Sequence, residues 1–199
     1  MKTVLLHGLG QTAQDWAKVT EQTLNSNIDC PEIFSSEDNL TYTKIYDRLE
    51  QRYLNTTEPF RICGLSLGAL LALDFTIRHK DKVDSLILIA AQYKVPGLLI
   101  DFQNIIFRCM PNKAFDTMGI SKRNMLALTR SMRSLDFTSE LGKIVCPITI
   151  VCGEKDKANL NASKKLKEFL PHAKLCIVPE AGHEVNKTNP QAIADILNE

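Results

Sequence analysis

The stretch Phe60-Arg61-Ile62-Cys63-Gly64-Leu65-Ser66-Leu67-Gly68 combines an apolar run with the pattern G-x-S-x-G. The run over Phe60–Leu65 predicts a buried strand, and the apolar residues of Leu67–Arg78 predict a helix. A serine at so sharp a strand-to-helix turn leaves no space for side chains two positions away, and glycines at 64 and 68 relieve that crowding. The turn raises Ser66 above the sheet at a helix N-terminus, where negative charge is favoured. We interpret Ser66 as a nucleophile rather than as part of a merely tight turn.

Short apolar runs alternate with helical patterns along most of the chain. Further strands are expected at Thr3–His7, Ser85–Ala90, Pro147–Cys152 and Lys174–Val178, with a weaker one near Ile28–Phe34. Most of these runs are apolar on both faces, as parallel strands are when helices cover both sides of the sheet. Helices are expected over Tyr42–Leu54, Asn161–Leu170 and Gln191–Leu197. The alternation predicts an α/β fold with a mainly parallel sheet and right-handed crossovers.

The segment Tyr93–Leu141 breaks this alternation, because it contains no convincing strand. Its patterns predict two helices instead, over Leu98–Cys109 and Lys122–Met132. One helix is enough to connect two parallel strands, so the segment is longer than the sheet requires. We expect a single domain over residues 1–199 with a helical cap inserted at about residues 93–141.

A serine hydroxyl needs a base to become a nucleophile, and His183 is the strongest candidate among the four histidines. It follows the strand that ends near Val178, and reactive groups collect at the carboxyl edge of an open α/β sheet. His79 and His172 lie at helix ends that are predicted to be exposed. His7 is expected to brace the loop after the first strand rather than to take part in catalysis.

The histidine in turn needs an acid, and the strand Pro147–Cys152 runs into two carboxylates, Glu154 and Asp156. Asp156 lies further beyond the strand, where its side chain can reach the histidine loop, so we favour it over Glu154. The strand Ser85–Ala90 is followed by Gln92 and offers no carboxylate.

The remaining requirement is a pair of donors for the developing alkoxide, which backbone N–H groups commonly supply. Glycines in the stretch His7-Gly8-Leu9-Gly10 allow N–H groups to turn inward. We expect the donors to be the backbone N–H groups of Leu9 and Leu67.

Taken together, these motifs resemble those of the α/β-hydrolase superfamily, in the chain order Ser66, Asp156, His183. The resemblance covers most of the chain through Val4–Gly10 with Trp16, Cys63–Gly68, Pro147–Asp156 and Pro179–His183. It implies a parallel sheet with helices on both faces, a cap at about residues 93–141 and no cofactor. The chain begins at what resembles the third strand of the family, so we expect a minimal version with about six strands.

The expected activity is that of a serine hydrolase, which cleaves a carboxylic ester or thioester through an acyl-enzyme. The same triad also serves carbon–carbon bond hydrolysis and acyl transfer, and the fold does not choose among them. A non-catalytic binding protein is a less favoured alternative, because such proteins usually lose a triad residue. The expected partner is a small-molecule acyl substrate, and the oligomeric state is open.

Composition narrows the remaining classes of function. The chain has 24 Lys and Arg against 23 Asp and Glu, which gives a net charge of +1. This balance does not indicate the basic surface that binds nucleic acid or an acidic membrane. The apolar run Val4–Leu6 is too short for a signal peptide, and no stretch has the length of a membrane span, so the cytoplasm is expected. The six cysteines contain no CxxC pair, and Cys63, Cys152 and Cys176 lie in strand-like runs. We therefore expect reduced cysteines and no metal site.

Two patterns in the cap have two interpretations each. The residues Leu98, Leu99, Phe102, Ile105 and Ile106 fit one helix face and either pack the cap onto the sheet or roof the pocket above Ser66. The stretch Ser121–Leu135 contains basic residues and no acidic one, and its cations are Lys122, Arg123, Arg130 and Arg133. They form either a solvated face or an attraction for an anionic substrate.

Overall fold

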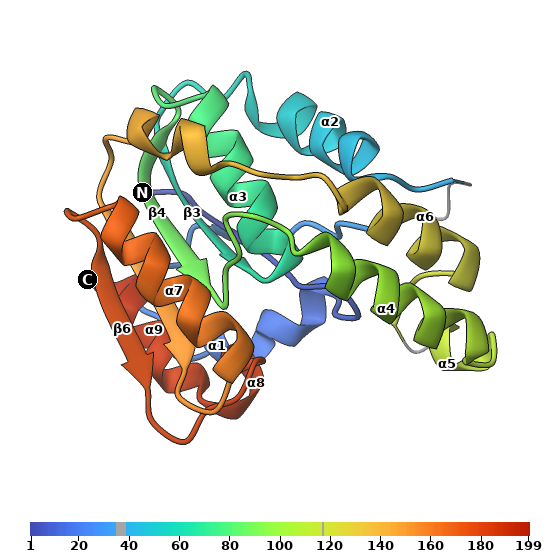
Figure 1. Ribbon diagram of the computed structural model, residues 1–199. Coiled ribbons are helices and arrows are strands. Elements are labelled where there is room, and N and C mark those ends of the chain that lie inside the picture. The colour runs from blue at the N-terminus through green and yellow to red at the C-terminus, as the bar shows by residue number, and fades with distance from the viewer. Residues whose placement is uncertain (35–38, 117) are drawn as a thin grey trace.

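A sheet of parallel strands forms the centre of the molecule (Figure 1). The computed structural model describes residues 1–34, 39–116 and 118–199, and the side chains of Leu99 and Asp116 lie outside that description. Six strands pair in the order β2-β1-β3-β4-β5-β6, and every neighbouring pair is parallel. Their bounds are β1 Thr3–Leu6, β2 Ile28–Asp29, β3 Phe60–Leu65, β4 Val83–Ile89, β5 Ile148–Gly153 and β6 Lys174–Val178.

Helices cover both faces of this sheet, because alternate strand residues point to opposite sides. Val4 and Leu6 of β1 belong to the core cluster beneath α2, α3 and α7, whereas Leu5 belongs to the cluster beneath η1, α1, α8 and α9. These helices are η1 Ala13–Trp16, α1 Ala17–Thr20, α2 Tyr42–Tyr53, α3 Leu67–Arg78, α7 Lys157–Phe169, α8 Val185–Thr188 and α9 Pro190–Asn198. The predicted six-stranded sheet with two helical layers is confirmed.

Two predicted elements differ from the structure. The strand expected near Ile28–Phe34 is wrong beyond Asp29, because Pro31 has no N–H for a sheet ladder and the amide of Ile33 donates to His7 Nε2 instead. The helix expected from Asn161 begins at Lys157, four residues earlier. Asp156 is its N-cap and accepts a hydrogen bond from the amide of Asn159. The residue predicted as the acid therefore also begins a helix.

Between β4 and β5 the chain leaves the sheet and returns at nearly the same place. The amide of Val95 donates to the Leu135 carbonyl, and the amide of Phe137 donates to the Tyr93 carbonyl, both at 2.9 Å. These bonds close the base of a segment that contains α4 Gly97–Cys109, α5 Lys113–Asp116 and α6 Lys122–Met132, followed by η2 Thr138–Lys143. Helix α4 packs on α6, and α6 also contacts α2, so the helices form a cap to one side of the sheet (Figure 1).

The apolar stripe predicted on the first cap helix faces solvent, so neither interpretation of it is correct. Leu98 is 82% exposed and Phe102 63%, and Ile105 and Ile106 are also exposed. The opposite side of α4 turns inward with Ile100, Gln103 and Phe107. This inner side mixes apolar and polar residues, because Asn104 is buried there too, whereas the exposed stripe is apolar. Apolar spacing alone therefore does not identify the inner face. The side chain of Leu99, the fifth predicted member, is outside the described residues.

Two further expectations concern the chain as a whole. All six cysteines are unpaired, and Cys63 and Cys152 are buried in the core as small apolar side chains. Within the described residues, no helix has the combination of length and apolar character that crossing a bilayer requires.

Candidate active site

Ser66 lies between β3 and α3 in a backbone conformation that few residues other than glycine adopt, with φ 54° and ψ −109°. A Cβ atom at Gly64 would stand 2.1 Å from the Gly68 carbonyl oxygen, and one at Gly68 would stand 2.1 Å from that of Leu6. Neither position has room for a side chain. The crowding at Gly64 comes from within the turn, as predicted, whereas that at Gly68 comes from the end of β1. The Ser66 amide is fixed by a hydrogen bond to the Ile89 carbonyl at 2.9 Å.

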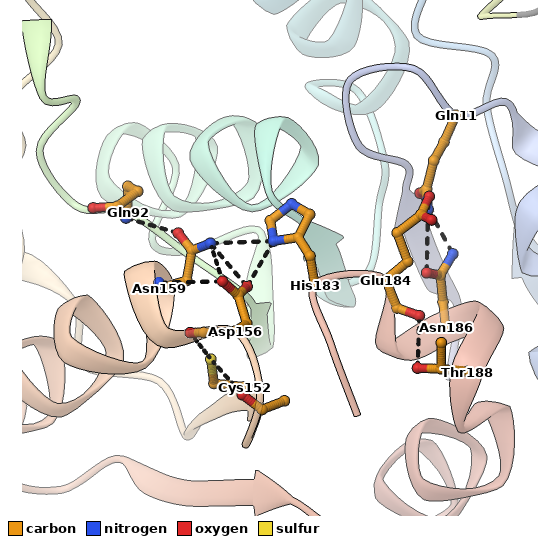
Figure 2. A network of polar contacts seen from close by, with 10 residues as sticks. Gln11, Gln92, Cys152, Asp156, Asn159, His183, Glu184, Asn186 and Thr188 are labelled. Carbon is orange, nitrogen blue, oxygen red and sulfur yellow. Dashed lines mark hydrogen bonds and ion pairs between the residues drawn. The ribbon is translucent and has the colours of Figure 1, made fainter. Parts of the chain in front are cut away.

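The structure brings His183 and Asp156 together from two different loops at the carboxyl edge of the sheet. Nδ1 of His183, in the loop between β6 and α8, lies 2.7 Å from Oδ2 of Asp156, which follows β5 (Figure 2). The Asp156 side chain is only 8% exposed, and that of His183 is 42% exposed. With Nδ1 donating to the carboxylate, Nε2 is left on the opposite side of the ring. Glu154, the alternative acid, accepts from the amide of Glu180 at 3.0 Å instead.

The histidine loop reaches Asp156 because Gly153, the last residue of β5, has no side chain. A Cβ atom at Gly153 would lie 2.2 Å from the carbonyl oxygen of Gly182 and 2.5 Å from that of Ala181. The amide of Lys155 donates to the Ala181 carbonyl at 2.9 Å and holds the two loops together. Gly153 lies within the sequence motif Pro147–Asp156, but no role was predicted for it. The signal that could have revealed this role is a glycine at the end of a buried strand.

Asn159 and Gln92 complete the surroundings of the acid, and sequence analysis missed both roles. Nδ2 of Asn159 donates to Oδ1 and Oδ2 of Asp156 at 2.9 and 2.8 Å, and it lies 3.1 Å from His183 Nδ1. Oδ1 of Asn159 accepts from Gln92 Nε2 at 2.7 Å, which fixes the orientation of the amide (Figure 2). Burial would raise the pKa of Asp156, but hydrogen bonds from His183 and Asn159 hold the pKa below its ordinary value. The available signal was the position of Asn159, three residues after a helix N-cap.

The two predicted backbone donors are the N–H groups of Leu9, in the loop after β1, and of Leu67, at the start of α3. Leu9 is in a turn closed by the Gln11 amide and the Gly8 carbonyl at 3.2 Å, with Gly10 at φ 77°. Leu67 is the first residue of α3, so its N–H has no acceptor within the helix. The buried ring of His7 accepts from the Ile33 amide at Nε2, and its Nδ1 lies 3.0 Å from the Gly8 carbonyl. These contacts fit the bracing role expected of His7.

Gln11 joins this turn to the histidine loop, a connection that the sequence did not reveal. The Gly8 amide donates to Oε1 of the buried Gln11 at 3.1 Å, and Nε2 of Gln11 donates to Glu184 Oε1 at 2.9 Å (Figure 2). Asn186, also buried, lies 3.3 Å from Gln11 Nε2 through its Oδ1. The turn around Leu9 and the residue after His183 are therefore held in a fixed relation.

Ser66 and His183 line one cavity of about 510 Å³ between the sheet edge and the cap. Leu9 and Leu67 line it as well, and the cap contributes Ile100, Gln103, Phe107, Met118, Met125, Thr129 and Met132. In the described part of the chain, no group of three or more His, Cys, Asp or Glu residues is arranged to hold a metal ion. The arrangement places a hydroxyl and an oriented imidazole at a common, mostly apolar space.

A parallel sheet with a strained serine turn at β3 and a histidine–aspartate pair at its carboxyl edge is the architecture of the α/β-hydrolases. The model of the alpha/beta hydrolase family matches residues 3–196, and the chain belongs to this family of hydrolases.

Similar proteins span several activities. A protein of Bacillus subtilis assigned as a 2-succinyl-6-hydroxy-2,4-cyclohexadiene-1-carboxylate synthase is 24% identical over 245 aligned positions, which cover 98% of this chain and 88% of that protein. A protein of Agrobacterium fabrum assigned as the carbamate hydrolase RutD is 27% identical over 67% of this chain and 63% of its own length. A thermophilic esterase from Thermogutta terrifontis superposes with a TM-score of 0.79 at 18% identity, over 99% of this chain and 88% of the esterase. That likeness shows the shared fold.

Proposed function

We propose that this protein is a serine hydrolase that cleaves a small carboxylic ester or thioester through an acyl-enzyme. The observation that carries the proposal is the 2.7 Å contact between His183 and Asp156 at a cavity that Ser66 also lines. Nothing but an oriented base is needed to activate a serine hydroxyl. In this proposal Ser66 is the nucleophile, His183 the general base and Asp156 the acid that orients it.

In the acylation step, Ser66 Oγ forms a bond to the substrate carbonyl carbon while His183 Nε2 takes the hydroxyl proton. Asp156 keeps Nδ1 as the donor and stabilises the imidazolium that forms. The carbonyl π electrons move to the oxygen, which accepts hydrogen bonds from the amides of Leu9 and Leu67. When the tetrahedral intermediate collapses, the bond to the leaving group breaks and His183 returns its proton to that group.

In the deacylation step, His183 takes a proton from water, and the hydroxide forms a bond to the acyl carbon. When the second intermediate collapses, the bond between the acyl carbon and Ser66 Oγ breaks, the carboxylic acid leaves, and His183 returns its proton to Ser66 Oγ. If an alcohol or amine replaced water here, the reaction would be acyl transfer. The same triad also hydrolyses carbon–carbon bonds, and one relative is assigned as a synthase. The cavity has a volume of about 510 Å³ and a mostly apolar lining from the cap, which supports a small acyl substrate in all these cases.

Covalent labelling by a fluorophosphonate probe tests the proposal directly. We expect a single adduct on Ser66, loss of labelling in Ser66→Ala, and a fall in ester turnover on the order of a millionfold. Ser134→Ala removes an exposed cap serine and is the matched control, with labelling and turnover unchanged. Labelling that persists in folded Ser66→Ala would refute the assignment of Ser66 as the nucleophile, and absence of labelling in the folded wild-type protein would favour a non-catalytic role for the site.

A further inference from the structure

The cavity beside Ser66 has no fixed charge among the residues that are described around it. Its polar side chains are Ser66, Gln92, Gln103, Thr129, Asn159 and His183, and the rest of the lining is apolar or glycine. None of the residues outside the description (35–38, Leu99, Asp116 and Thr117) is a lysine or arginine. A substrate group that enters this cavity therefore meets no lysine or arginine there.

Most of the polar lining is already engaged within the protein. Gln92 donates to Asn159, and Asn159 donates to Asp156. The Thr129 hydroxyl donates inside the cap, to Asn104 or to the Met125 carbonyl. In the part of the chain that is described, the Gln103 side chain makes no hydrogen bond, and it stands on the cavity wall between Ile100 and Phe107. An uncharged amide is thus the polar group that the cap helix α4 presents to a ligand.

The cap does carry cations, but they lie outside the cavity. Arg133 forms a two-pronged pair with Asp101, with Nε and Nη2 each 2.9 Å from a carboxylate oxygen. Nζ of Lys122 donates to the carbonyls of Arg108 and Met110 at 2.7 Å. Neither these residues nor Arg123 and Arg130 line the cavity. The expectation that the basic stretch attracts an anionic substrate is not supported, and its members contribute to the outer surface.

Burying a carboxylate or phosphate without a cation or a set of donors carries a large desolvation penalty. An apolar acyl chain meets the opposite situation, because Met118, Met125 and Met132 form a wall of flexible thioether side chains that adapts to different shapes. We propose that this cavity receives the acyl group of the substrate and admits only uncharged, largely apolar acyl groups. This inference rests on the proposed function, since it concerns the acyl group that Ser66 accepts.

The test compares p-nitrophenyl hexanoate with p-nitrophenyl hemiadipate, whose acyl groups both have six carbons but differ by a terminal carboxylate. The p-nitrophenyl ester of monomethyl adipate controls for polarity and size without charge. Rates are corrected for spontaneous hydrolysis and for turnover that remains in Ser66→Ala. We expect kcat/KM for the hexanoate to exceed that for the hemiadipate by at least about a hundredfold. The methyl ester should stay within about tenfold of the hexanoate.

A cation placed in the cavity should reverse part of this preference. Gln103→Lys is expected to raise kcat/KM for the hemiadipate at least about tenfold, because the ammonium pairs with the buried carboxylate. Ile106→Lys adds the same charge on the exposed side of the same helix and should change kcat/KM less than about twofold.

Each outcome decides a separate question. Equal turnover of both esters by the Ser66-dependent activity would overturn the inference and leave the proposed function standing. Rescue by Ile106→Lys as large as that by Gln103→Lys, or no rescue by a folded Gln103→Lys, would also overturn it. If folded Ser66→Ala retained the wild-type rate for these esters, the proposed function would be refuted, and the inference would fall with it.

Discussion

The substitution Gly153→Ala separates the position of the histidine loop from the chemistry of its residues. The added Cβ atom would lie 2.2 Å from the Gly182 carbonyl oxygen, and real Cβ atoms stay beyond 3.0 Å from such an atom. The loop must therefore withdraw by about 0.8 Å, a distance comparable to the 1 Å displacements that cost about a hundredfold in rate. Since His183 follows Gly182 directly, we expect kcat to fall by about a hundredfold.

The assay is steady-state ester hydrolysis, with the melting temperature measured on the same preparations. Gly182→Ala and Gly142→Ala are matched controls, because a Cβ atom at either position meets no atom within 4 Å. Both controls should retain kcat within about threefold, since neither requires the loop to move. If Gly153→Ala retained wild-type kcat and stability, the contact between β5 and the histidine loop would not position His183, and the reasoning above would be wrong.

Four further outcomes follow from the site and from the cap helix α4. Asp156→Asn should lower kcat on the order of ten-thousandfold, and Glu154→Gln should leave it within about threefold, because Asp156 is the one of these two carboxylates that contacts His183. The reverse order of severity would make Glu154 the acid. Asn159→Ala should lower kcat about tenfold by removing donors to the Asp156 carboxylate. Because the folded-state pKa of Asp156 is lowered, its carboxylate adds stability above its unfolded pKa and loses it as the pH falls through the folded pKa. Asn159→Ala raises that folded pKa towards the unfolded value, so the acid loss in urea titrations should be smaller and should be complete at a higher pH than in wild type; an unchanged profile would contradict this. Phe102→Ala should change stability by less than about 0.5 kcal/mol, because its side chain is exposed, and a larger loss would show that the stripe packs in the core.

Local sequence patterns were sufficient for the strands and for most of the long helices. Strands buried on both faces produce continuous apolar runs, which is why β3 and β5 could be placed to within a residue or two. The strand near Ile28–Phe34 failed beyond Asp29, where the pairing with β1 ends and the Ile33 amide bonds instead to a buried histidine that is distant in the chain. The cap helix α4 was placed correctly along the chain but not in rotation. Its apolar periodicity points to the exposed side, because the inner side includes the polar residues Gln103 and Asn104.

The sequence by itself determined the serine turn, because the pattern G-x-S-x-G stands between an apolar strand run and a helical run within a few consecutive residues. It also predicted His183 and Asp156, since each directly follows a recognisable strand. Only the tertiary structure decided what surrounds them: Gln92 reaches Asn159 across 67 residues, and Gln11 reaches Glu184 across 173. Such contacts form between polar side chains whose types and spacing carry no periodicity. They depend on which strand ends the sheet order brings together, and a one-dimensional pattern does not contain that order.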